Sequence, residues 1–297
     1  MPELTKPAVL RTALGRHPVS AVLRSGELTE PGVTLDFTDV EPIHRAFAPM
    51  VRTQAYDVSE LAVVTALQAI AFRHPVVILP IVVAARFQRR CLITLSSQAV
   101  EDPRELRGKR VGVRAYTQTT GFWIRSHLAE DYGLAASDFD WVTQDEAHVP
   151  EYSDPAFVHR TLKPSLVDAL RGGEIDAAIL GNDLPSGDEF APVIDRAAQR
   201  DRDWYAGHGY LPVNHLVSVS AQILEREPEA VRAAWRLLTR AEEQASPAAD
   251  TPRVTMAGLE RLSEPVREIA DACFSQGLLP RPLTADEVFG PVRQLIA

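Results

Sequence analysis

A strand, a polar turn and a helix start within residues 106–134 constrain the fold of this chain more than any other stretch. Arg110–Val113 is short, apolar and rich in valine, which predicts a buried strand. From about Gln118 to Tyr132 apolar residues recur at four-residue spacing, as in a helix, and Gly133 suits the left-handed residue that ends one. Strands and helices that alternate in this way are typical of an α/β fold.

The turn between this strand and this helix is suited to binding an anion. The first N–H groups of a helix are unpaired and lie at the positive end of its macrodipole. Arg114 stands beside them, and Thr117 or Thr119 can serve as the N-cap. The strand-to-helix turn of any α/β protein has similar features, so an anion site and a purely structural turn both remain open.

The same alternation continues along the chain. Strands are expected at Ala8–Ala13, Val33–Phe37, Pro75–Ala85, Cys91–Leu95, Phe139–Val142 and Leu211–Val219, and helices at Val19–Leu28, Pro42–Arg52, Ser165–Gly172 and Glu229–Gln244. The segment 56–60 is expected to lead directly into an apolar helix that ends near Phe72. This order predicts a largely parallel sheet.

Composition and charge exclude several classes of function. A chain of 297 residues is long enough for two lobes, each with its own core. A net charge of −9 and a pI near 5.4 argue against nucleic acid or an anionic membrane as the main partner. The first 18 residues show no apolar signal region, and Cys91 and Cys273 are expected to be reduced core thiols, so we expect a cytoplasmic protein.

No motif for a metal or a cofactor is present in the sequence. The eight histidines form no HExxH pattern and no cluster with cysteine. The sequence also contains no GxGxxG, P-loop or GxSxG pattern. We therefore predict no metal site and find no sign of a cofactor.

Three motifs together resemble a known family. GKRVGV is followed by Tyr116, Thr119, Trp123 and Arg125 at a characteristic spacing, while Asp-Val-Ser-Glu stands at 57–60 and Pro-Val-Asn-His at 212–215. The set is similar to the 4,5-dihydroxyphthalate decarboxylase family, whose members resemble the substrate-binding proteins of ABC transporters. The resemblance implies the two-lobed type 2 periplasmic-binding-protein fold, with residues 1–93 and 213–297 in lobe one and 94–212 in lobe two. It also implies a ligand cleft between the lobes.

The sequence departs from the family on segments that face the ligand. Gln88 stands where the family usually has Arg, and Arg89 where it has His. Ala115 and Thr117 replace Glu and Gln on either side of the tyrosine, and Ala85 is a further departure. These differences put the identity of the substrate in question.

The resemblance makes His215 the candidate for proton transfer, because an imidazole exchanges protons near neutral pH. Glu60 would act as an acid or orient His215. The structural alternatives are a hydrogen-bonded histidine at a strand end and a carboxylate at a helix N-terminus. The candidates for substrate binding are His17, Ser59, Arg86, Arg89, Arg114, Tyr116, Thr117, Thr119, Thr120 and Trp123. Core packing of Trp123, a plain turn at His17 and solvated arginines remain open.

These features predict a cofactor-independent decarboxylase of a hydroxylated aromatic or heteroaromatic carboxylate, which protonates the ring and loses carbon dioxide in a closed cleft. The alternatives are a lyase similar to chorismate dehydratase on the same fold, or a non-catalytic cytoplasmic protein that binds small acids. The expected partner is a small anionic aromatic ligand, not nucleic acid or a membrane, and a homodimer is left open.

Overall fold

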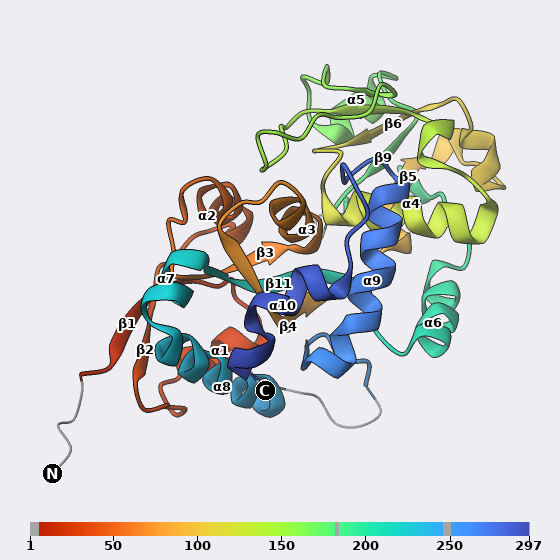
Figure 1. The fold of residues 1–297 in the computed structure, drawn as a ribbon. Coiled ribbons are helices and arrows are strands. Elements are labelled where there is room, and N and C mark those ends of the chain that lie inside the picture. Colours follow the sequence, from red (N-terminus) through yellow and green to blue (C-terminus); the bar gives the residue numbers. More distant parts are fainter. Residues whose placement is uncertain (1–5, 182–183, 246–250, 297) are drawn as a thin grey trace, which may run out of the picture. The chain divides into compact units, whose positions relative to one another are not determined.

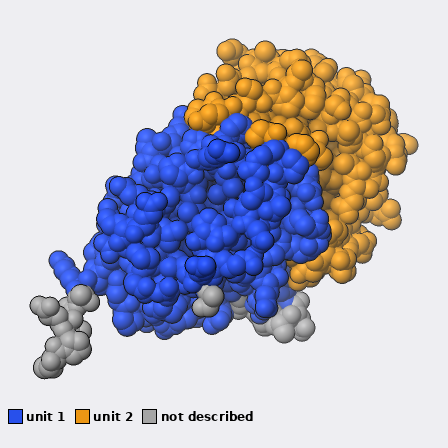
Figure 2. Space-filling model, viewed as in Figure 1, with its two compact units in different colours: residues 1–86, 213–271, 281–297 blue, residues 87–212, 272–280 orange. Residues whose placement is uncertain are grey.

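Two six-stranded mixed sheets form the framework of the chain, one in each of two units (Figures 1 and 2). The computed structural model describes residues 6–181, 184–245 and 251–296. Unit 1 comprises Met1–Arg86, Val213–Asp271 and Arg281–Ala297. Unit 2 comprises Phe87–Pro212 and Ala272–Pro280.

The sheet of unit 1 has the strand order β12-β4-β11-β3-β1-β2. Its strands are β1 (Ala8–Ala13), β2 (Val33–Phe37), β3 (Val58–Ala62), β4 (Val76–Ala85), β11 (Val213–Ser220) and β12 (Met256–Ala257). The helices of this unit are α1 (Pro18–Arg24), α2 (Phe47–Thr53), α3 (Val63–Ala71), α7 (Ala221–Arg226), α8 (Pro228–Ala245), α9 (Leu259–Ser275, whose last turn belongs to unit 2) and α10 (Ala285–Ile296). Figure 1 shows α2 and α3 on one face of the sheet and α1 and α8 on the other.

Burial on both faces explains why β4 reads as an unbroken apolar run. Val77, Leu79 and Ile81 belong to the hydrophobic core that includes α1 and α8, and alternate residues such as Ile78 face the other way. Burying these side chains is the main stabilising contribution to such a sheet, at about 25 cal/mol per Å² of apolar area. Packing against this core holds in place the strands whose ends carry the candidate site.

The sheet of unit 2 has the order β10-β5-β9-β6-β7-β8. Its strands are β5 (Leu92–Leu95), β6 (Arg110–Val113), β7 (Asp140–Thr143), β8 (Val158–His159), β9 (Ala177–Ile179) and β10 (Phe190–Pro192), and its helices are α4 (Thr119–Tyr132), α5 (Leu166–Arg171) and α6 (Ala197–His208). The strand, turn and helix predicted around residues 106–134 are present, and Gly133 ends α4 with φ 64°.

Two expectations about the sheets were wrong. The sheets are not largely parallel, because β11 pairs antiparallel with both β3 and β4 in unit 1, and β5 pairs antiparallel with both β9 and β10 in unit 2. Strand β11 enters its sheet on the return of the chain from residues 87–212 rather than through a helical crossover within the unit. A helix was expected directly after the segment 56–60, but residues 58–62 form the strand β3, which pairs with β1 on one side and β11 on the other.

The chain enters unit 2 a second time at residues 272–280, which the sequence did not indicate. Gln276 explains it, since its side chain accepts a hydrogen bond from Nε of Arg125 at 2.7 Å and its carbonyl accepts one from the hydroxyl of Tyr116 at 2.8 Å. Over the ranges that the structure describes, no helix has the length and apolar character needed to cross a bilayer.

Candidate active site

Glu60 is the centre of a polar cluster inside unit 1. It lies on β3, in the middle of the sheet, and only 1% of its surface is exposed. Its Oε2 accepts hydrogen bonds from the backbone N–H of Gly15 at 2.8 Å and from Nε2 of His17 at 3.1 Å, and Nδ1 of His215 lies 2.8 Å from Oε1. We call His17, Glu60 and His215 the His–Glu–His cluster.

The position of His17 at the start of α1 fixes its tautomer. His17 is the N-cap of the helix, and its Nδ1 accepts a hydrogen bond from the backbone N–H of Ser20 at 3.2 Å. An imidazole nitrogen that accepts carries no proton, so the proton of neutral His17 is on Nε2. This nitrogen therefore donates to Glu60.

His215 has the opposite tautomer. It lies on β11, directly across the ladder from Ala62, and its Nδ1 donates to the carboxylate of Glu60. Its Nε2 has no hydrogen-bond partner among the residues that the structure describes, and 23% of the side chain is exposed. The ring of Phe47 packs edge-on against the imidazole with the centroids 5.2 Å apart. His215 is thus held at one nitrogen and free to exchange a proton at the other.

The electrostatics of the cluster keep Glu60 ionised. Burial raises the pKa of Glu60, but the hydrogen bonds and charges of His17 and His215 outweigh burial and lower the pKa to about 2. At neutral pH the carboxyl group has no proton to give. Of the two roles considered for Glu60, this favours orienting His215 over acting as the acid.

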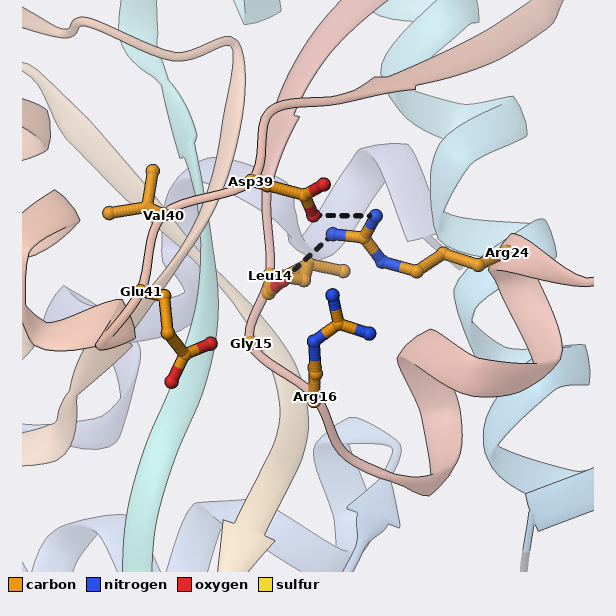
Figure 3. A pocket seen from close by; sticks show the side chains of 7 residues that line it. All are labelled: Leu14, Gly15, Arg16, Arg24, Asp39, Val40 and Glu41. Carbon is orange, nitrogen blue, oxygen red and sulfur yellow. Dashed lines mark hydrogen bonds and ion pairs between the residues drawn. The ribbon is translucent and has the colours of Figure 1, made fainter.

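A pocket lies beside the cluster, at the carboxyl ends of β1 and β2 (Figure 3). Its volume is about 250 Å³, and its walls are Leu14, Gly15, Arg16, Arg24, Asp39, Val40 and Glu41. Gly15 belongs both to the pocket and to the surroundings of Glu60. Among the residues described, no group of three His, Cys, Asp or Glu side chains is arranged to hold a metal ion.

The candidates at the start of α4 lie in unit 2. Arg114 pairs with Asp145 at 3.6 Å. Thr119 is the first residue of α4, and its buried hydroxyl has no hydrogen-bond partner in the described part of the chain. Thr117 and Thr120 are also buried. Tyr116 is 1% exposed, its hydroxyl donates to the carbonyl of Gln276, and the guanidinium of Arg125 lies 3.9 Å above its ring.

Four other candidates make contacts within the protein. Arg89 is buried and pairs with Asp131 at 3.0 Å and Asp201 at 2.9 Å. Trp123 packs against the rings of His127 and Trp204. Buried Ser59 donates its hydroxyl hydrogen to the carbonyl of Glu60, and Arg86 is half-buried just after β4.

The structure therefore brings together His17, Glu60 and His215, which lie far apart in the sequence. Sequence reasoning missed the contribution of Phe47 and the residues 39–41 of the pocket, whereas the segment 15–18 was expected to reach the ligand cleft. The signal for Gly15 was its place two residues after the first strand, at the carboxyl end of a parallel pair. Nothing in the sequence indicated that Phe47 would meet His215.

Comparison with known proteins places the chain near two curated enzymes. It is 31% identical over 215 residues to a 4,5-dihydroxyphthalate decarboxylase of Pseudomonas putida, covering 68% of this chain and 83% of that one. It is 28% identical over 239 residues to a 4,5-dihydroxyphthalate decarboxylase of Comamonas testosteroni, covering 74% and 70%. No family model matches the chain. The resemblance inferred from the three motifs is confirmed.

Solved structures with a similar fold include sulfonate-binding proteins. The aliphatic sulphonate binding protein SsuA of Escherichia coli matches with a TM-score of 0.61 and 14% identity, over 95% of this chain and 92% of that one. The alkanesulfonate-binding protein SsuA of Xanthomonas axonopodis pv. citri matches with a TM-score of 0.57 and 15% identity, over 95% and 98%. At such identities the comparison shows the fold alone. It confirms the two-lobed α/β fold of the periplasmic-binding-protein type.

Proposed function

Because the chain belongs to the 4,5-dihydroxyphthalate decarboxylase family, we propose that it decarboxylates a hydroxylated aromatic acid by protonating the ring from Nε2 of His215. The family makes the chain a carboxy-lyase of a hydroxylated aromatic acid. The finer proposal concerns the substrate, 4,5-dihydroxyphthalate or a close relative, and the source of the proton.

The observation that carries the mechanism is the arrangement of His215. Its Nδ1 is held 2.8 Å from an ionised carboxylate, and its Nε2 is free. The carboxylate stabilises the imidazolium form that must exist before the proton is transferred, and it fixes the direction of the ring. Nε2 is therefore suited to donate a proton.

In the proposed reaction, the ring carbon that bears the carboxylate takes the proton from Nε2. A ring hydroxyl supplies electron density that stabilises the protonated ring. The bond to the carboxylate then breaks, its electron pair returns to the ring and restores aromaticity, and carbon dioxide leaves. Neutral His215 regains its proton from water. Exclusion of water from the leaving carboxylate favours this step, and closure of a cleft on the substrate stays a prediction.

Substitution of His215 tests this mechanism. His215→Gln should lower the release of carbon dioxide from 4,5-dihydroxyphthalate by about 10²–10⁴-fold, the range for losing a general acid. His159, an exposed histidine, provides the matched control, and His159→Gln should retain full turnover. Full turnover by His215→Gln would remove the histidine from the mechanism.

The products distinguish the two alternatives. Loss of water instead of carbon dioxide from a panel of cyclic carboxylic acids would indicate a lyase similar to chorismate dehydratase. Tight binding of these acids without turnover would indicate a protein that only binds. Location in the cytoplasm and the oligomeric state stay predictions.

A further inference from the structure

The pocket at the ends of β1 and β2 has its own polar character. The guanidinium of Arg24 already has partners within the protein. It pairs with Asp39 at 3.1 Å, donates to the carbonyl of Leu14 at 3.3 Å and lies 4.3 Å from the ring centroid of Phe37. In Figure 3 the dashed lines mark the ion pair with Asp39 and the hydrogen bond to Leu14. The positive charge of Arg24 is therefore largely neutralised within the protein.

The charged groups of Arg16 and Glu41 differ from that of Arg24. Within the described part of the chain, the guanidinium of Arg16 makes no ion pair or hydrogen bond, and neither does the carboxylate of Glu41. Figure 3 shows the guanidinium of Arg16 pointing toward the space beside Arg24, with Glu41 on the far side of Gly15. The pocket thus offers one free cation and one free anion at different positions on its wall.

The pocket adjoins the His–Glu–His cluster through Gly15. The N–H of Gly15 donates to Oε2 of Glu60 at 2.8 Å, and a Cβ atom added to Gly15 would lie only 3.4 Å from Oε1. The same Cβ would meet the side chain of Ile43 at 3.2 Å. Gly15 is therefore shared by the wall of the pocket and the surroundings of Glu60.

We propose that this pocket binds the polar edge of the aromatic substrate, with Arg16 pairing with a retained carboxylate and Glu41 accepting a hydrogen bond from a ring hydroxyl. A guanidinium presents parallel donors that match a carboxylate. An ionised carboxylate such as Glu41 can only accept, so it favours a hydroxyl and repels a second acid group. The pair therefore sets which edge of the ring enters.

This inference rests on the proposed function for the class of ligand. It assigns the binding of the carboxylate that stays on the ring to Arg16 rather than to Arg114. The charges decide between the two, because Arg114 already pairs with Asp145 whereas Arg16 makes no ion pair with any residue that the structure describes. Both pocket side chains are exposed, so their substitution should leave the fold intact.

Calorimetric titration with three probes tests the assignment. Phthalate carries only carboxylates, catechol only hydroxyls, and 3,4-dihydroxybenzoate carries both. Arg16→Gln should weaken binding of phthalate and 3,4-dihydroxybenzoate about tenfold, the scale of one charge-assisted hydrogen bond, and leave catechol unchanged. Glu41→Gln should weaken catechol and 3,4-dihydroxybenzoate and leave phthalate equal or tighter. Arg226→Gln, on an exposed arginine of α7 in the same unit, is the control and should change none of them.

The outcomes separate this inference from the proposed function. If carbon dioxide release depends on His215 but Arg16→Gln and Glu41→Gln leave all three affinities unchanged, the pocket assignment is overturned and the function stands. If Arg16→Gln and Glu41→Gln change the affinities for the three probes as expected but no acid is decarboxylated, the pocket assignment is supported and the proposed function is wrong. Failure of every probe to bind the wild-type protein at millimolar concentration would also overturn the pocket assignment.

Discussion

At the scale of single residues, one buried carboxylate fixes two histidines in opposite tautomers. His17 accepts at Nδ1 and donates at Nε2, whereas His215 donates at Nδ1 and leaves Nε2 free. The difference follows from the backbone around each ring, because only His17 caps a helix. The contacts of each ring therefore decide which of its nitrogens carries the proton: the cap and Glu60 for His17, and Glu60 for His215.

Substitution of His17 separates its two roles. Asparagine is a good N-cap but is too short to replace the contact with Glu60, so His17→Asn should retain the helix start and lose the bond to the carboxylate. We expect a loss of about 1–3 kcal/mol of unfolding free energy and a lower kcat with KM nearly unchanged. Ser20→Ala removes the hydroxyl that accepts a hydrogen bond from the backbone N–H of His17 at 3.1 Å, and it should lower stability without changing kcat in this way. Equal effects of both changes on kcat would contradict the positioning role.

The hydroxyl of Thr119 allows a second prediction for a single residue. It is buried without a hydrogen-bond partner among the described residues, a situation that costs about 1–3 kcal/mol. Thr119→Val should therefore raise the unfolding free energy of the free protein. If this turn also binds an acid group, the same change should weaken phthalate binding in calorimetry, and unchanged affinity would mean that the turn is purely structural.

At the scale of elements, the sequence was informative where a pattern was local. The strand β6, the helix α4 and the left-handed Gly133 follow from periodicity and turn chemistry, and the structure shows them almost as expected. The strand β3 was missed because all five of its residues are buried and Val63 begins α3 with no turn between them. Neither alternation nor a breaker marks such a strand.

The candidate site was predictable only in part, for the same reason. The motif at 57–60 identified Glu60, but its three donors come from 45, 43 and 155 residues away. Only the pairing of β3 with β1 and β11 brings them together, and register is a property of the whole sheet. The role of Arg89 likewise depends on Asp131 and Asp201, which no local pattern connects to it.

Gln276 provides a prediction at this scale, because it joins the end of α9 to α4 within unit 2. It supplies the acceptor for Nε of the fully buried Arg125 and donates to the carbonyl of Phe122 at 3.2 Å. Gln276→Ala should lower the unfolding free energy by about 3 kcal/mol, because a buried charge loses a partner. Ser275→Ala, at the exposed neighbouring position, should have almost no effect. Chemical denaturation measures both, and similar small effects would mean that Arg125 finds other partners.

At the scale of the whole molecule, acid should weaken both units through different groups. In unit 1, Glu60 has a pKa of about 2 in the folded state and about 4.5 when unfolded. The unfolded state therefore binds the proton first, and stability is lost as the pH falls from about 4.5 to 2. The loss amounts to about 3 kcal/mol, from roughly 1.4 kcal/mol for each unit of pKa. Glu60→Gln should abolish this part of the acid transition.

In unit 2, buried His127 makes acid destabilising at a higher pH. Burial, together with the charges of Arg89 and His208, holds the pKa of His127 well below its usual value of 6.5. Below about pH 6.5 this histidine binds a proton in the unfolded chain but not in the folded chain. The free energy of unfolding therefore falls by up to about 1.4 kcal/mol per pH unit. Neither ring nitrogen has a partner among the described residues, so the folded state cannot compensate.

His127→Phe tests this contribution, because phenylalanine can keep the contacts with Trp123 and Trp204 and carries no proton. We expect the variant to be more stable than the wild type at pH 7.5 and to lose much less stability between pH 6.5 and 5. Urea unfolding at a series of pH values measures the difference, and His159→Gln, at an exposed position of β8, should keep the wild-type slope. If His127→Phe falls with pH as steeply as the wild type does, the sensitivity of unit 2 to acid between pH 6.5 and 5 does not come from this ring.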